Sequence, residues 1–302
     1  WNNGEITVHE PYAVLTAGLA SLMTGDINQD GTSDFAIGNE KVEFHATPAI
    51  GGRLLSAVDR ASGRNQLFLD YPGVERTRGD AWNAWAEYGG VNDWFPADWP
   101  GEVWNVDWDA RVKETAGDRV SVVLSTVTRD NLFIQKEFSL TPQSSGLKME
   151  YEIRNLGNTT KPMFWTNHPD LAPGGSADGQ DQYIVPALDE KGRLYLARGN
   201  FEPRLQKSHL VPGADWILAY DSADKGYLLQ TFSRGLVDKI GVWEGKSFFT
   251  MELNFKKENL KPGAATRFGV DYIVGQDDLD TLLKKHELKL PEPEKTNHGQ
   301  GG

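Results

Sequence analysis

Between residues 26 and 34 the chain has a loop whose composition suits a hard cation. Acidic and Asn side chains alternate with other residues along these nine positions, and Gly31 follows the third acidic or Asn-bearing position. Calcium in proteins binds about six to eight oxygens, and a glycine allows the sharp turn that gathers them. We expect the ligands to be the side chains of Asp26, Asn28, Asp30 and Asp34 and the main-chain carbonyl of Thr32.

The spacing separates this loop from an EF-hand, which has a bidentate Glu at its twelfth position. Here that position is Ile37, so the loop resembles the shorter calcium loops of extracellular repeat and adhesion proteins. The alternative is a polar, Asx-rich turn that binds no metal.

A second region, residues 82–101, is dense in Trp, acidic residues and Gly. Loops with many aromatic residues often bind ligands, and flat rings suit the apolar faces of sugars. The alternative is a long loop folded over its own cluster. The candidate binding residues here are Trp85, Asn92, Asp93 and Trp94.

Two further positions could carry proton-transfer chemistry. His168 lies in Phe164-Trp165-Thr166-Asn167-His168-Pro169-Asp170, at the end of a predicted strand, where an imidazole can act as an acid or base. Glu252 alternates with apolar neighbours in a strand-like segment. Alone, the first is usually a structural hydrogen-bonding group and the second a solvated carboxylate.

Composition excludes several classes of function. The chain has 302 residues and a net charge of −12, which repels nucleic acids and anionic lipid surfaces, so we expect neither as a partner. No apolar run approaches the roughly 20 residues of a membrane span. With no cysteine, the chain has no disulfide framework and no thiolate nucleophile.

The expected location is secreted or periplasmic, because weak calcium sites are useful where calcium is abundant. The chain begins Trp1-Asn2-Asn3-Gly4, without a Met or an apolar signal core. We interpret this as an N-terminus from which any signal segment has been removed.

Apolar residues recur with a period of two throughout the chain, which predicts an antiparallel all-β protein, a large sandwich. One short helix is predicted near the C-terminus, capped by Asp277 or Asp278. The expected organisation is an N-terminal extension with the calcium loop (1–40), a sandwich domain (41–290) and a disordered tail (291–302).

Several short motifs occur in the order found in one known family. They are Gly51-Gly52-Arg53-Leu54-Leu55-Ser56, Tyr88-Gly89-Gly90, Thr166-Asn167-His168-Pro169, Met251-Glu252-Leu253 and Leu260-Lys261-Pro262-Gly263. Across about residues 40–275 the sequence resembles the galactose-mutarotase-like superfamily, which includes the aldose 1-epimerases, as a divergent member.

The resemblance implies a β-supersandwich with a sugar cleft on a concave sheet face. In an epimerase a Glu removes the proton of the anomeric hydroxyl while a His protonates the ring oxygen, so His168 would be the acid and Glu252 the base. The partner would be a sugar or polysaccharide, without an organic cofactor. We expect the imidazole and the carboxylate to meet across a single concave wall lined with indole rings.

The sequence departs from the family pattern at two places. Tyr88 stands where the epimerases have a His-Gly-Gly histidine, and Pro169-Asp170 stands where they have an aromatic pair. Tyr88 is therefore included as a candidate catalytic residue. Besides the aromatic-loop residues named above, the candidate substrate-binding residues are Arg53, Asn167 and Asp170.

Two alternative functions remain open. One is a non-catalytic carbohydrate-binding protein. The other is a polysaccharide lyase or hydrolase that uses Tyr88 and His168 with a nearby acid, Glu87 or Asp93. A lyase also needs a cation to neutralise a uronate carboxylate, for which Arg53, Arg76 and Arg78 are available. The negative net charge disfavours long polyanionic substrates.

Overall fold

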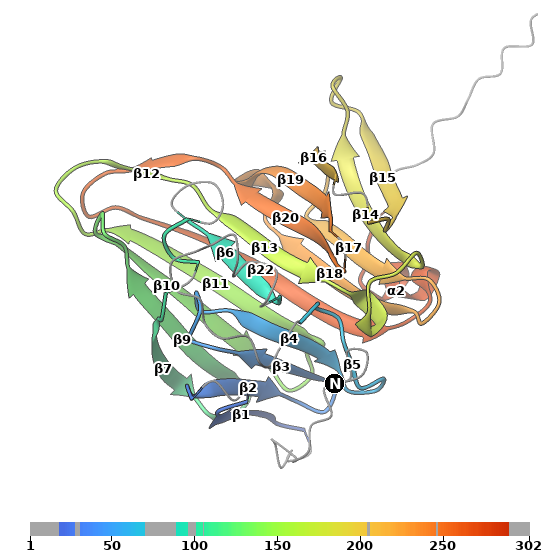
Figure 1. Cartoon of the computed structure of the whole chain (residues 1–302), viewed down its shortest axis with the longest axis horizontal. Helices are drawn as coiled ribbons and strands as arrows, with labels where there is room; N and C mark the ends of the chain where they lie inside the picture. The colour runs from blue at the N-terminus through green and yellow to red at the C-terminus, as the bar shows by residue number, and fades with distance from the viewer. Residues whose placement is uncertain are drawn as a thin grey trace, which may run out of the picture.

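The computed structural model describes residues 18–27, 31–69, 89–95, 101–104, 106–203, 206–245 and 247–289. Within these ranges the chain forms a large antiparallel β structure with one short α-helix (Figure 1), which confirms the predicted fold class. The strands form two layers with a shared apolar core between them. They are called layer A and layer B.

Layer A carries the candidate site. Its main strands follow one another in the spatial order β1, β2, β3, β4, β6, β13, β20, β19 and β16. Their bounds are β1 Ala20–Gly25, β2 Asp34–Gly38, β3 Val42–Ala46, β4 Leu54–Asp59, β6 Val91–Trp94, β13 Thr166–Leu171, β20 Phe249–Phe255, β19 Val237–Glu244 and β16 Gln206–Pro212. Two short strands, β5 (Arg64–Asn65) and β8 (Ala116–Gly117), pair with β4 and β1.

Layer B follows the order β7, β9, β10, β11, β22, β18, β17, β14 and β15. Their bounds are β7 Asp109–Glu114, β9 Val120–Val127, β10 Leu132–Leu140, β11 Gly146–Asn155, β22 Ala265–Gln276, β18 Gly226–Phe232, β17 Trp216–Asp221, β14 Asp181–Leu188 and β15 Leu194–Asn200. Strand β16 pairs with both β19 and β14 and so joins the two layers. A separate ribbon consists of β12 (Lys161–Met163) and β21 (Glu258–Leu260), and 3₁₀ turns span Pro173–Gly175 and Arg234–Leu236.

The alternation of side chains along each strand divides buried from exposed positions. In β11, Leu147, Met149, Tyr151 and Ile153 face the core, while Lys148, Glu150 and Arg154, which occupy alternate positions, are exposed. This is the period-two pattern that the sequence predicts for a half-buried strand.

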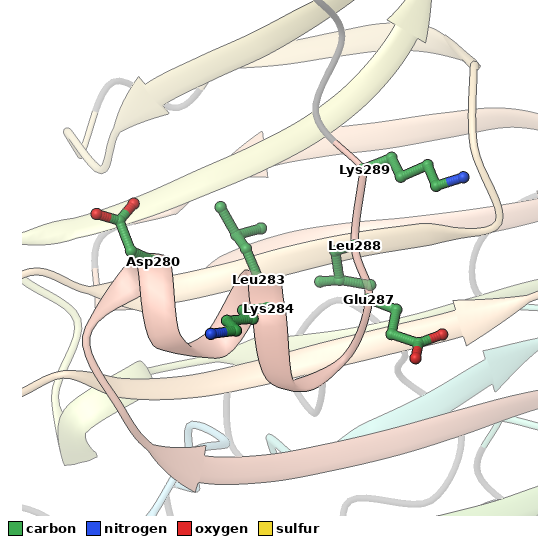
Figure 2. Close-up of a pocket in the computed structure, with 6 residues that line it drawn as sticks. All are labelled: Asp280, Leu283, Lys284, Glu287, Leu288 and Lys289. Carbon is green, nitrogen blue, oxygen red and sulfur yellow. The ribbon is translucent and has the colours of Figure 1, made fainter.

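A second, smaller apolar cluster lies on the other side of layer B, where the helix α2 (Leu279–Lys285) covers it through Leu282. Asp278 caps this helix and accepts a hydrogen bond from the backbone N–H of Thr281 at 3.0 Å, as the sequence predicts. A hollow beside α2 is lined by Leu283 and Leu288 with charged neighbours (Figure 2). It lies on the outer side of layer B, away from the candidate site.

The described part of the N-terminal 40 residues is integrated into layer A. Strands β1 and β2 form a hairpin, with Gly25 opposite Asp34, and β2 pairs in turn with β3. The predicted calcium loop is the connection of this hairpin. Within the described part of the chain, no helix has the length and apolarity that crossing a membrane requires.

Candidate functional site

The candidate site lies on the face of layer A that points away from the shared core. Strand register places His168 of β13 opposite Asn92 of β6. On the other side of β13, Asn167 pairs with Leu253 and Asp170 pairs with Thr250, so His168 in the same register lies level with Glu252. Residues opposite one another in neighbouring strands share a face.

The imidazole and the carboxylate meet, as predicted. His168 Nε2 lies 3.6 Å from Glu252 Oε1. Both side chains are buried, each only 1% exposed, so the pair is not open to solvent. The Trp94 ring stacks on the imidazole with a centroid separation of 4.4 Å.

Two hydrogen bonds define which imidazole nitrogen carries the proton in the neutral form. The indole N–H of Trp94 donates to Asn92 Oδ1 at 2.8 Å, which fixes the orientation of the Asn92 amide. Asn92 Nδ2 then faces His168 Nδ1 at 3.3 Å. An amide NH₂ can only donate, so Nδ1 is the acceptor and Nε2, which points at Glu252, bears the hydrogen.

Burial strongly affects the charge states of His168 and Asp170. Desolvation, together with the nearby cations Lys207 and Arg53, lowers the pKa of His168 to about 4, although Glu252 opposes the shift. Burial, with a smaller contribution from Glu252, raises the pKa of Asp170 well above its usual range despite the nearby Arg53. At neutral pH the imidazole is therefore uncharged, and burial favours the protonated form of Asp170.

Lys207 of β16 is a member of the site that the sequence motifs did not identify. Its ammonium donates to both carboxylate oxygens of Glu252, at 2.9 Å and 2.7 Å. It also lies 5.4 Å from the centre of the Trp94 ring. Thr250 adds a hydroxyl bond to Glu252 at 3.2 Å. In the sequence, Lys207 is only a cation in a segment of alternating residues. Its contact with Glu252 depends on which strands become neighbours in the fold.

Arg53, predicted to bind substrate, is fully buried beside the group. Its Nε donates to the carbonyl of Ile50 at 2.8 Å and its Nη1 to the carbonyl of Gly89 at 3.1 Å. The structure thus places Arg53 as a buried cation whose charge lowers the pKa of His168 and opposes the rise in that of Asp170.

Gly89 and Gly90 have a steric reason to be glycines. Both have positive φ angles, 63° and 78°. A Cβ atom at Gly89 would lie 2.2 Å from the carbonyl oxygen of Phe68, and one at Gly90 would lie 2.4 Å from that of Leu54. Only glycine fits a left-handed conformation this close to another backbone.

Asp93 and Asn167, two other predicted substrate-binding residues, point to the opposite face and are not brought together with His168. They lie in the core between the layers, where Asp93 Oδ2 forms an ion pair with Lys136 Nζ at 2.6 Å. Asp93 Oδ1 also accepts bonds from Tyr151, Trp165 and Asn167 at 3.0–3.1 Å. Alternation along β6 and β13 separates them from Asn92, Trp94 and His168.

Some predicted site residues lie outside the described residues, namely Tyr88, Trp85, Asn28 and Asp30. In the predicted calcium loop, Asp26 Oδ2 accepts from the N–H of Gly31 and Asp34 Oδ2 from that of Ile27, both at 3.0 Å. Thr32 lies in the same connection. Among the described residues, no group of three or more acidic, His or Cys side chains is arranged to hold a metal.

Comparisons with known proteins give structural matches only. No protein-family model matches the sequence, and no curated protein matches it. A putative aldose 1-epimerase from Klebsiella pneumoniae has a similar structure, with a TM-score of 0.64 and 11% identity over 89% of this chain and 87% of that one. A galactose mutarotase-like protein from Clostridium acetobutylicum matches with a TM-score of 0.63 and 13% identity, covering 85% and 99% of the two chains.

A TPR-domain-containing protein from Parabacteroides distasonis matches with a TM-score of 0.67 and 17% identity over 87% of this chain. This chain spans about half of that protein, 50% of its length. These identities are low, and they establish similarity of fold rather than of activity. The chain has the galactose mutarotase-like fold and is a divergent example of it.

Proposed function

We propose that the protein binds a sugar on the outer face of layer A and performs aldose 1-epimerase-like acid and base chemistry at the anomeric centre. The observation that supports this most directly is the approach of His168 Nε2 to Glu252 Oε1, at 3.6 Å, beside the Trp94 ring. Motifs more than 80 residues apart in the chain meet in space with the chemistry that the reaction needs.

The reaction requires two coordinated proton transfers. Glu252 accepts the proton of the anomeric hydroxyl, and His168 delivers a proton through Nε2 to the ring oxygen. The bond between the anomeric carbon and the ring oxygen breaks, and the former hydroxyl oxygen forms the aldehyde. Rotation of the open chain and the reverse transfers close the other anomer. Both oxygens are attached to one carbon, so acid and base must be near neighbours.

Access to the pair requires a change at Lys207. Glu252 is 1% exposed, whereas the side chain of Lys207 is 36% exposed. A sugar hydroxyl can reach the carboxylate by taking the place of the ammonium group, because this is the polar contact on the side that reaches solvent. The ring of Trp94 is then available as an apolar surface next to the sugar.

The test is catalysed anomer exchange. Fresh single-anomer aldoses are followed by polarimetry, and their exchange at equilibrium by NMR, with wild type and the His168→Gln and Glu252→Gln variants. We expect acceleration by wild type and a loss of at least about 100-fold in either variant, the size typical of general acid–base catalysis. His286→Gln, on the opposite side of the molecule beside Tyr227, is the matched control and should retain full activity.

A second candidate function, sugar binding without turnover, is favoured by one observation. The low pKa of His168, about 4, leaves little protonated imidazole at neutral pH to serve as the acid. Calorimetric binding of a sugar that is lost in Glu252→Gln, with no acceleration of anomer exchange between pH 4 and 8, would support this candidate. Absence of both binding and exchange across a panel of aldoses would contradict both.

We also propose that the loop at residues 26–34 binds Ca²⁺ and that the protein acts outside the cytoplasm. Support for the calcium site comes from the oxygen-rich composition of the loop and from the hairpin geometry that brings Asp26 and Asp34 to its two ends. The ion would be held by Asp26, Asn28, Asp30, Thr32 and Asp34, where it would stiffen the connection between β1 and β2.

A further inference from the structure

Lys207 reaches Glu252 across an intervening strand. Strand β19 lies between β16 and β20, and its Gly241 is paired with Glu252 on one side and His209 on the other. Lys207 lies opposite Trp243, two residues further along β19. Its side chain therefore runs diagonally over β19 to the carboxylate.

The absence of a side chain at Gly241 makes this path possible. A Cβ atom there would lie 2.7 Å from Glu252 Oε2 and 3.3 Å from Lys207 Cε. The first distance is a clash, and the second would press on the lysine stem. Gly241 has an ordinary strand conformation, since it is not among the residues with positive φ. A glycine is needed here because it leaves space for the ion pair between Lys207 and Glu252.

We propose that Lys207 is a positioning residue that clamps Glu252 in the ligand-free protein and thereby controls how readily His168 takes up a proton. When the ammonium holds the carboxylate, Glu252 is already neutralised and gains little from a charged imidazole. When the ammonium leaves, a buried carboxylate lacks a cation, and the adjacent imidazole is the group that can supply one.

Among the groups around His168, Lys207 is the one whose position can change when a ligand enters. Strand β6 contributes the neutral side chains Asn92 and Trp94. On β13, Asp170 Oδ1 lies 3.4 Å from His168 Nδ1, and burial raises the pKa of this enclosed carboxyl. Arg53, which precedes β4, is a fixed cation bound to backbone carbonyls.

On β20, Glu252 opposes the lowered pKa of His168, and Lys207 from β16 reinforces it. Of the charged groups named, only the side chain of Lys207 is partly exposed to solvent. It is therefore the one that an incoming hydroxyl can displace.

This arrangement connects ligand entry to the acidity of the pair. A hydroxyl that replaces the ammonium on Glu252 removes a positive charge near His168. The negative charge of the carboxylate is then no longer compensated by Lys207. Both effects raise the proton affinity of His168. An acid that is nearly absent in the ligand-free protein becomes available when the site is occupied.

The experiment is a pH titration of the histidine ring by NMR, in ligand-free protein with labelled histidine. The His168 signals are assigned by their loss in His168→Gln. We expect the pKa of His168, about 4 in wild type, to move toward that of an ordinary histidine in Lys207→Met and in Lys207→Gln. Lys207→Arg, which keeps the charge, should remain close to wild type.

Lys239→Met is the matched control. Lys239 lies on the neighbouring strand β19, opposite Asn254, and does not contribute to the shifted pKa of His168. The same substitution there should leave the titration unchanged. Circular dichroism confirms that each variant is folded before it is titrated.

The inference is overturned if folded Lys207→Met and Lys207→Gln both titrate like wild type, or if Lys207→Arg shifts as much as they do. It concerns the same side chains as the proposed function, but the readout needs no sugar and no turnover. A shifted titration without anomer exchange would sustain the role of Lys207 and reject the enzymatic proposal. The reverse pattern would reject only the role of Lys207.

Discussion

Two lysine–carboxylate pairs lie on opposite faces of layer A, and they differ in how completely they are enclosed. Lys136 and Asp93 form a 2.6 Å ion pair in which both side chains have no exposed surface. Lys207 and Glu252 form a pair of nearly the same length, 2.7 Å, but the lysine side chain is 36% exposed. Distance alone does not separate the two pairs.

The surrounding hydrogen bonds separate them. Around Asp93, Tyr151, Trp165 and Asn167 all donate to the carboxylate, and Lys136 also binds the carbonyl of Gly52 at 2.5 Å. Every position around that carboxylate is occupied by the protein itself. Glu252 instead has an imidazole at 3.6 Å, beyond ordinary hydrogen-bond length, and a lysine that can move into solvent. The enclosed pair joins the two layers, whereas the partly open pair is suited to exchange partners.

The largest expected effect comes from breaking the enclosed pair. Asp93→Asn or Lys136→Met should lower the free energy of unfolding by about 3–5 kcal/mol, because each leaves a buried charge without its counterion. Urea denaturation measures this loss. The matched change on the open face, Glu252→Gln, should cost less than about 1 kcal/mol, because Lys207 can turn into solvent. Equal losses at the two positions would remove the distinction between the pairs.

The second prediction concerns pH. The unfolded chain protonates His168 near pH 6.5, whereas the folded protein holds its pKa at about 4. Between these values the unfolded state binds more protons, so stability falls as pH falls, by up to about 3 kcal/mol from this group.

Thermal unfolding of wild type and His168→Gln from pH 7 to pH 4 measures the difference. Asp170, whose raised pKa acts in the opposite direction, is present in both proteins. Parallel curves would show that the imidazole is not held neutral by its surroundings.

The third prediction concerns the space above β19. Gly241→Ala should destabilise the protein by about 1–3 kcal/mol through overpacking, and it should displace Glu252 from Lys207. It should also weaken sugar binding measured by calorimetry. Gly235→Ala is a suitable control, since a Cβ atom there meets nothing within 4 Å. Wild-type stability and binding in Gly241→Ala would show that the open pair tolerates rearrangement more than its geometry indicates.

The smallest effect is expected at the β1–β2 connection. If the loop binds Ca²⁺ with a Kd of about 1 mM, 10 mM calcium should stabilise the protein by about 1.4 kcal/mol, by mass action. Melting curves with calcium and with chelator measure this, and Asp30→Ala should abolish the difference. Identical curves for wild type would mean that the loop is only a turn.

The site was predictable to the extent that its residues lie in short motifs. His168 and Glu252 were identified because the ordered motifs around them resemble one family, and register then brought them together. The side of the sheet was predicted less well. The motifs predict one site that includes Asp93 and Asn167 together with their sequence neighbours Asn92, Trp94 and His168. Adjacent residues in a strand face opposite ways, and this alternation separates the two groups.

The all-β class and the C-terminal helix with its Asp278 cap follow from local sequence pattern, because side-chain periodicity and capping act over a few residues. The motifs also pointed to the identities of the imidazole and the carboxylate. By contrast, the contact of Lys207 with Glu252, the space that Gly241 leaves for it, and the ion pair of Lys136 with Asp93 arise only in the folded protein. These contacts depend on which distant strands become neighbours and in what register, a property of the whole packed sheet that no local pattern encodes.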